Sequence, residues 1–169
     1  MLNQPESKSS KKSIDSNKNN QLNFLRLIQK AVVEKDMGNE FFKKGKYQRA
    51  VDCYTEGKKC DPKSNILATN RGMAVLKLNR EKEAEKDCTL AIMLDPNYAK
   101  AYIRQVYARL GLKRYSGAIK DYEKVMQFQF LTNAELKNYV PDRLLRLLHV
   151  HRMLVLLMFL GKEEKQSLL

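Results

Sequence analysis

Apolar residues return every three or four positions from about residue 22 to residue 125, which is the spacing of one face of an α-helix. Turn signals divide this pattern into short segments. Gly45 suits the end of a helix. Two Asp-Pro pairs, at 61–62 and 95–96, end helices because the residue before proline is pushed out of the α region. The pattern therefore predicts an all-α protein built from pairs of short helices.

The same kinds of residue recur at a step of 34 positions. Small residues, larger inner-face residues and prolines all keep this step: Gly38 and Gly72; Ala50, Ala84 and Ala118; Tyr54, Cys88 and Tyr122; Pro62 and Pro96. A fixed period of this length is typical of a helical repeat array, whose units stack because none can bury its apolar face alone. We expect three repeats, at about residues 31–64, 65–98 and 99–132, within a domain spanning 21–132.

Glycines in the first two repeats mark a close helix contact. Gly38 and Gly72 are expected where the two helices of one repeat approach most closely, and a larger side chain there should force the backbones apart. The third repeat has Val106 in this register. A β-branched residue at such a contact should widen the third helix pair.

Both ends of the chain differ in composition from the repeats. Residues 1–20 are rich in Ser, Asn and Lys without apolar periodicity, which predicts a disordered basic arm. The apolar run at 22–31 predicts an N-terminal helix extension that caps the front of the stack. Pro141 suits the first turn of a helix, so residues 133–169 are expected to hold a C-terminal capping helix.

The apolar run at 153–160 leaves alternatives open for the tail. Eight consecutive apolar residues follow a Leu-rich stretch, and Arg and His residues interrupt that preceding stretch. A membrane span needs about 18–20 mostly apolar residues. A cap is the favoured interpretation; a membrane tether or a dimer face are the alternatives.

Charge and composition narrow the function classes. Lys and Arg exceed Asp and Glu by 32 to 19, a net charge of +13, which favours an acidic partner. Nucleic acid is one such partner, but no recognised binding motif is present, so none is expected. The sequence also lacks a phosphate loop and a paired-histidine metal motif, so we expect no enzyme, cofactor or metal. Three scattered cysteines fit a reducing compartment, and we expect a cytoplasmic or nuclear location.

The repeat pattern resembles the tetratricopeptide repeat family. The matching positions in the first repeat are Gly38, Phe41, Gly45, Tyr47, Ala50, Tyr54 and Pro62. Those in the later repeats are Gly72, Ala84, Ala91, Pro96, Tyr102, Tyr115, Ala118 and Tyr122. The resemblance implies a right-handed superhelical stack of three helix pairs.

A narrower resemblance concerns the carboxylate-clamp members of this family, which bind the C-terminal Glu-Glu-Val-Asp tails of Hsp90 and Hsp70. Their five clamp residues correspond here to Lys35, Asn39, Asn70, Lys100 and Arg104. The resemblance implies a cochaperone adaptor. The amino-acid sequence of residues 34–47 and 85–92 is similar to that of a cochaperone subunit that works with AAA+ ATPases in assembling large complexes. A generic repeat scaffold without chaperone specificity is the alternative.

The chemistry of the five clamp residues suits a dicarboxylate. Lys35 and Asn39 are four positions apart, as are Lys100 and Arg104, so each pair shares one helical face. A C-terminal Asp offers two carboxylates, which cations and amide donors bind through charge-assisted hydrogen bonds. Further peptide contacts are predicted for three residues of the second repeat. Met73 and Leu76 are expected to floor an apolar pocket, and Lys77 to contact an acidic residue.

Overall fold

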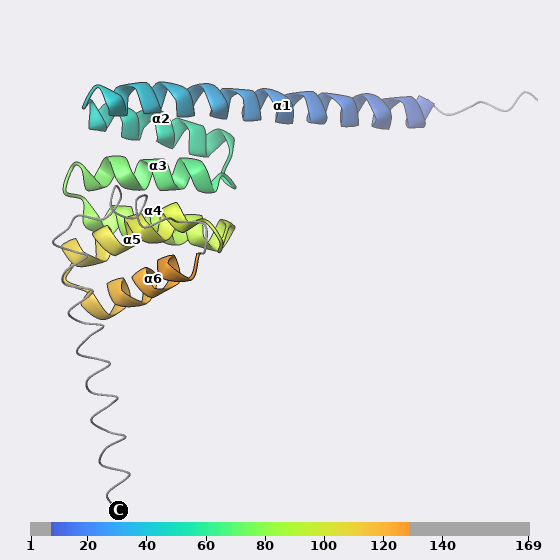
Figure 1. Cartoon of the computed structure of the whole chain (residues 1–169). Coiled ribbons are helices and arrows are strands. Elements are labelled where there is room, and N and C mark those ends of the chain that lie inside the picture. The colour runs from blue at the N-terminus through green and yellow to red at the C-terminus, as the bar shows by residue number, and fades with distance from the viewer. Residues whose placement is uncertain (1–7, 129–169) are drawn as a thin grey trace, which may run out of the picture.

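The computed structural model describes residues 8–128 of the 169-residue chain. Within that part, all regular structure is helical, as predicted (Figure 1). The helices are α1 (Lys8–Lys43), α2 (Tyr47–Cys60), α3 (Asn65–Leu76), α4 (Glu81–Leu94), α5 (Ala99–Gly111) and α6 (Tyr115–Gln127). They form three helix pairs in a superhelical all-α stack, which confirms the predicted fold class.

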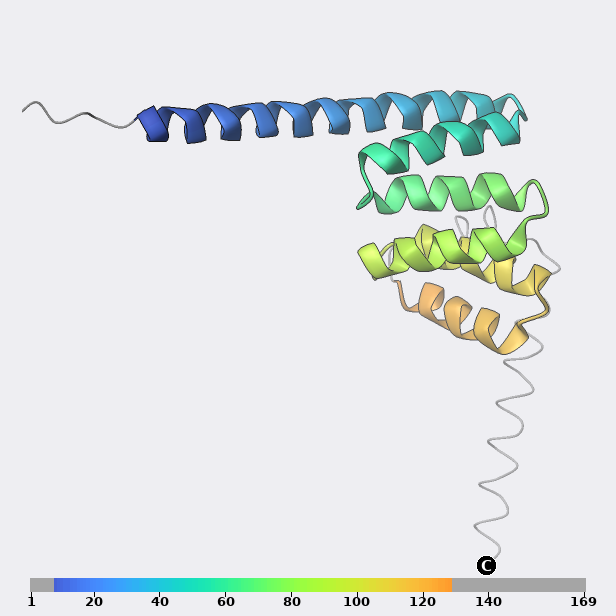
Figure 2. The same cartoon turned by 180° about the vertical axis from the view of Figure 1, so that it is seen from behind.

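The helices follow one another through the stack in chain order, with α1 at one end and α6 at the other (Figures 1 and 2). Each helix packs against the next one along the chain, and α3 also contacts α1 and α5. The first helices of the three repeats are therefore neighbours. This arrangement can bring side chains from α1, α3 and α5 onto one face, although they lie far apart in sequence.

The turn inside each repeat uses one residue with a left-handed backbone. Gly45, Asn79 and Lys113 have φ values of 70°, 54° and 58° and are 34 positions apart. At each turn, two backbone N–H groups bond back to the preceding helix; in the first, Gly45 N–H donates to Phe42 and Lys46 N–H to Phe41. These paired bonds are the Schellman motif, which satisfies the last carbonyls of the helix. Sequence reasoning had identified only the glycine.

Small residues allow the close helix contacts, as expected. A Cβ added to Gly38 would lie 2.5 Å from the Tyr54 ring, and one added to Gly72 would lie 3.1 Å from Cys88 Sγ. Ala50, Ala84 and Ala118 are fully buried. In the third repeat, Val106 is buried against Ala118 in a cluster of its own. The expected widening of that helix pair stays a prediction.

The N-terminal region differs from expectation in two ways. Helix α1 begins at Lys8, so the predicted disorder of residues 1–20 is wrong from that position onward. Extending an existing helix needs no new nucleus, which removes the main cost of ordering a polar segment. Most of the extension also projects beyond the other helices (Figure 1), whereas Ala31 at its end is buried in the main core cluster. Phe24 and Leu25 are 60% and 58% exposed, because the 14-residue α2 is too short to cover them.

The C-terminal predictions lie outside the described residues. These are the capping helix in 133–169 and its alternatives, a membrane tether and a dimer face. Among residues 8–128, no helix has the length and apolar character needed to span a membrane.

Candidate functional site

Three of the five predicted clamp residues touch one another through hydrogen bonds. Asn70 Nδ2 donates to Asn39 Oδ1 at 3.2 Å, and Arg104 Nη1 donates to Asn70 Oδ1 at 3.2 Å. Asn39 Oδ1 also accepts a bond of 2.8 Å from the hydroxyl of Tyr54. We call these four side chains the polar relay. It joins α1, α3 and α5 on one face and reaches α2 through the tyrosine.

The Tyr54 end of the polar relay is buried, with only 2% of the residue exposed. Burial raises the pKa of its phenol to about 12, and the positive charge of Arg104 partly opposes this rise. The phenol therefore keeps its proton at physiological pH. Sequence reasoning had placed Tyr54 on the inner face of its helix but had given it no part in the site. Only the fold shows that it reaches Asn39.

The two lysines of the predicted clamp lie at its ends. Lys35 stands one turn before Asn39 on α1, and its side chain is 30% exposed and forms a 3.3 Å ion pair with Asp36. Lys100 is exposed in the first turn of α5, one turn before Arg104. Their spacing from the polar relay puts both on the same face. A ligand carboxylate would compete with Asp36 for Lys35.

The three additional residues of the second repeat occupy different surroundings. Met73 is half-buried one turn after Asn70 on α3. Leu76 packs against the main core cluster, so part of its side chain stabilises the repeat stack. Lys77 is exposed and is the C-terminal cap residue of α3. Their contact with a peptide stays a prediction.

Two buried aspartates form ion-pair clusters that sequence reasoning missed. Asp87 on α4 is 2% exposed, accepts two bonds of 2.7 Å from Arg71 on α3, and pairs at 2.7 Å with Lys58 on α2. Asp121 on α6 is 7% exposed and accepts a 2.7 Å bond from Arg109 on α5. We call these the Asp87 and Asp121 clusters. The two aspartates are 34 positions apart, and this register was the available signal.

The Asp121 cluster also includes Glu85 on α4. Its carboxylate accepts a 3.2 Å bond from Arg109 and pairs with Arg114. Burial raises the pKa of Asp121 to about 6, outweighing the opposing effect of the Arg109 charge. The two clusters join successive helices across the repeat boundaries. Their buried carboxylates are already occupied by cations, so they are structural contacts.

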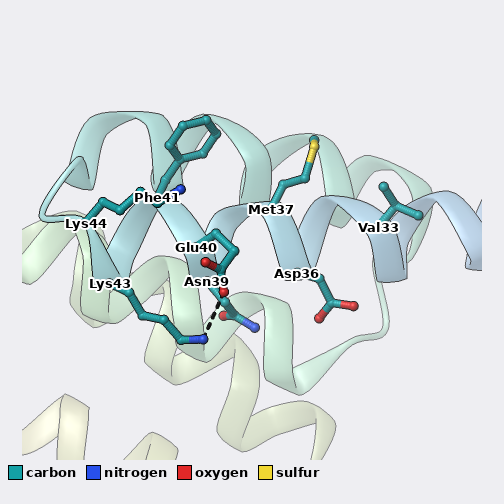
Figure 3. A pocket seen from close by; sticks show the side chains of 8 residues that line it. All are labelled: Val33, Asp36, Met37, Asn39, Glu40, Phe41, Lys43 and Lys44. Atoms are coloured by element: carbon teal, nitrogen blue, oxygen red, sulfur yellow. Dashed lines mark hydrogen bonds and ion pairs between the residues drawn. The ribbon is translucent and has the colours of Figure 1, made fainter.

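The outer face of α1 carries a hollow of about 570 Å³ (Figure 3). Val33, Met37 and Phe41 line one edge of it, while Asn39 points from α1 toward the following helices. Asn39 is the only predicted site residue among its lining residues. Across the described part of the chain, no cluster of three His, Cys, Asp or Glu residues could hold a metal ion.

A right-handed stack of 34-residue helix pairs, with its turns and small-residue contacts in register, defines a class of protein. The family model described as Tetratricopeptide repeat matches residues 67–98. The chain belongs to the tetratricopeptide repeat family.

Particular relatives lie within this family. RNA polymerase II-associated protein 3 of Xenopus tropicalis is 49% identical over 110 residues, which are 65% of this chain and 17% of that protein. Among solved structures, the second repeat domain of Spaghetti (RPAP3), bound to the HSP90 peptide SRMEEVD, is 48% identical with a TM-score of 0.59. The match covers 60% of this chain and 94% of that one. The second such domain of human RPAP3, in complex with the HSP70 peptide SGPTIEEVD, is 44% identical with a TM-score of 0.60, covering 66% and 95%.

The chain thus spans about a sixth of the length of the curated relatives it matches. By contrast, the match covers nearly the whole length of each isolated repeat domain. The matched parts of the solved relatives are repeat domains bound to chaperone peptides, which agrees with the prediction that the chain is not an enzyme.

Proposed function

We propose that this chain is a cochaperone adaptor that binds the acidic C-terminal tail of Hsp90 or Hsp70 through its clamp residues. The observation that carries the proposal is the polar relay, which brings Asn39, Asn70 and Arg104 together from three different helices. Similar domains bound to peptides ending in Glu-Glu-Val-Asp support it.

The electrostatics of this face fit the proposed ligand. Lys35, Lys100 and Arg104 supply three positive charges, while the two asparagines add hydrogen-bond donors without repelling a second carboxylate. Each charge-assisted hydrogen bond contributes roughly 1.5–3 kcal/mol. After the cost of ordering a flexible peptide, the expected Kd is on the order of micromolar.

The proposal also includes a role in the assembly of protein complexes. We infer that the bound chaperone is brought to a protein complex under assembly, alongside an AAA+ ATPase complex. Similarity to RNA polymerase II-associated protein 3 over 65% of this chain supports this inference. A cytoplasmic location is proposed with it. Pull-down of the tagged chain from cell extract, with Arg104→Ala as the comparison, would identify chaperone-dependent partners.

Calorimetry with two peptides tests the binding proposal directly. A peptide ending in Glu-Glu-Val-Asp is expected to bind, and its C-terminally amidated form to bind far more weakly. Arg104→Ala should weaken the free-acid peptide roughly 10- to 100-fold, which corresponds to the loss of one or two charge-assisted bonds. Arg26→Ala is the matched control, because Arg26 is exposed on α1 and precedes Asn39 by about 20 Å along the helix axis.

Equal binding of the two peptides would overturn the chaperone-tail proposal. It would favour the alternative, a generic repeat scaffold without chaperone specificity. Equal losses from Arg104→Ala and Arg26→Ala would show that only net charge matters, which would exclude a clamp.

A further inference from the structure

The polar relay has a defined direction. An asparagine amide carries one acceptor oxygen and one donor NH2 group on the same carbon, and it can present either to a ligand. Here the oxygen of Asn39 accepts from both Tyr54 and Asn70, at 2.8 and 3.2 Å. The oxygen of Asn70 accepts from Arg104. Both amide oxygens are therefore engaged within the protein.

This direction matters for an anionic ligand. A carboxylate accepts hydrogen bonds only, so an amide that turned its oxygen toward it would replace an attraction with a repulsion. With its oxygen held by two donors, Asn39 keeps its NH2 group available to the ligand. The relay thus sets which end of the amide a bound peptide meets.

Tyr54 is the end of the relay that cannot rearrange. Its ring lies against Gly38, where an added Cβ would come within 2.5 Å, and only 2% of the residue is exposed. The amide oxygen of Asn39 has no proton to give, so the phenol must be the donor in their contact. Burial raises its pKa to about 12, which keeps that proton in place.

We propose that Tyr54 is a positioning residue for carboxylate recognition, whose hydroxyl holds the Asn39 amide with its NH2 group toward the bound carboxylate. The inference rests on the proposed function and deepens it. It assigns to a tyrosine that is only 2% exposed part of the preference for a free C-terminal acid over an amide.

The test is Tyr54→Phe, measured by calorimetry with the free-acid and the amidated peptide. Loss of one oriented hydrogen bond should lower affinity for the acid roughly 3- to 10-fold. Affinity for the amidated peptide should stay the same or rise, because a released Asn39 oxygen can accept from a carboxamide. The acid-to-amide ratio should fall, whereas general loosening of the fold would weaken both peptides equally.

Two further variants isolate the mechanism. If Tyr54 acts through Asn39, then Tyr54→Phe should add no further loss in the Asn39→Ala background, so the double-mutant cycle should show coupling. Tyr115→Phe is the chemical control, since this tyrosine is 59% exposed at the start of α6. It should leave the acid-to-amide ratio unchanged.

A measurement on the unmutated protein keeps the test decisive if Tyr54→Phe folds poorly. In NMR spectra, the side-chain NH2 signals of Asn39 should shift with the free-acid peptide and much less with the amidated one. An unchanged ratio in Tyr54→Phe, or Asn39 signals insensitive to the acid, would overturn the inference while leaving the clamp intact. Failure of the unmutated chain to prefer the acid would overturn both.

Discussion

Two kinds of polar network cross this helical stack, and they differ in the groups that meet. The polar relay joins a phenol, two amides and a guanidinium across α1, α2, α3 and α5. The Asp87 and Asp121 clusters instead place buried carboxylates against Arg and Lys side chains of the neighbouring helices. Both networks link helices, but only the clusters use negative charge to do so.

The clusters hold neighbouring helices together, whereas the polar relay orders the face that is proposed to bind the peptide. A buried carboxylate compensates the arginines that join one repeat to the next, so those charges are used within the protein. An amide oxygen accepts a hydrogen bond from Arg104 without adding negative charge. This hydrogen bond therefore orders Arg104 without itself cancelling its positive charge, on the face that also carries Lys35 and Lys100.

Removing the carboxylate of the Asp87 cluster should give the largest effect on stability. Asp87→Ala leaves Arg71 and Lys58, 19% and 17% exposed, without their shared partner. Breaking a buried pair in this way typically costs about 3–5 kcal/mol. Urea denaturation should show a loss of this size. Peptide affinity measured on the folded fraction should not change.

Glu56→Ala is the control for this prediction. Glu56 pairs with Lys59 on the surface of α2, with both side chains exposed. Its loss should not measurably change the denaturation midpoint. Equal effects from Asp87→Ala and Glu56→Ala would contradict the distinction between the clusters and ordinary surface pairs.

The Asp121 cluster predicts a pH dependence with a definite sign. Because the pKa of Asp121 rises from 3.8 to about 6 on folding, the folded protein binds more protons than the unfolded chain between those values. The free energy of unfolding contributed by this group should therefore fall, by about 3 kcal/mol, as pH rises through that window. Above about pH 7, where the folded protein has also lost this proton, the contribution should be constant.

Asp121→Asn should remove this dependence, which thermal denaturation at a series of pH values would show. Asp52→Asn, on the exposed side of α2, is the control and should keep the pH profile of the unmutated protein. Parallel profiles for the unmutated protein and Asp121→Asn would show that another group is responsible.

A change at Gly38 should disturb stability and recognition together. In Gly38→Ala the new Cβ meets the Tyr54 ring, which has little room to move. Overpacking of this kind costs about 1–3 kcal/mol. The displaced ring should also release Asn39, so the acid-to-amide preference should fall with stability. A stability loss with unchanged preference would separate the ring position from the relay.

The smallest expected effect lies outside both networks. Lys113 holds a left-handed backbone conformation, with φ 58°, at a turn where glycine is favoured. Lys113→Gly should stabilise the protein by roughly 0.5–1 kcal/mol in chemical denaturation and leave peptide affinity unchanged. The same replacement at exposed Lys120, inside α6, should destabilise by about 1 kcal/mol.

Sequence reasoning succeeded where the signal was local or periodic. The 34-residue step placed Gly38 and Gly72 at close contacts, and the i, i+4 spacing put Lys35 with Asn39 on one helical face. It failed at the α1 extension, because disorder was inferred from composition without the effect of an adjoining helix. It also failed to identify Asp87 and Asp121, whose cationic partners come from other helices.

The amino-acid sequence by itself determined the repeat length, the all-α class and the residues available for a carboxylate clamp, because helical periodicity and repeat register are properties of neighbours along the chain. Only the tertiary structure decided that Tyr54 reaches Asn39 and that Asn70 bridges Asn39 to Arg104. These contacts join residues on different helices that are 15 to 34 positions apart in the sequence. Their geometry depends on how closely the helices pack, and no spacing within a single helix encodes it.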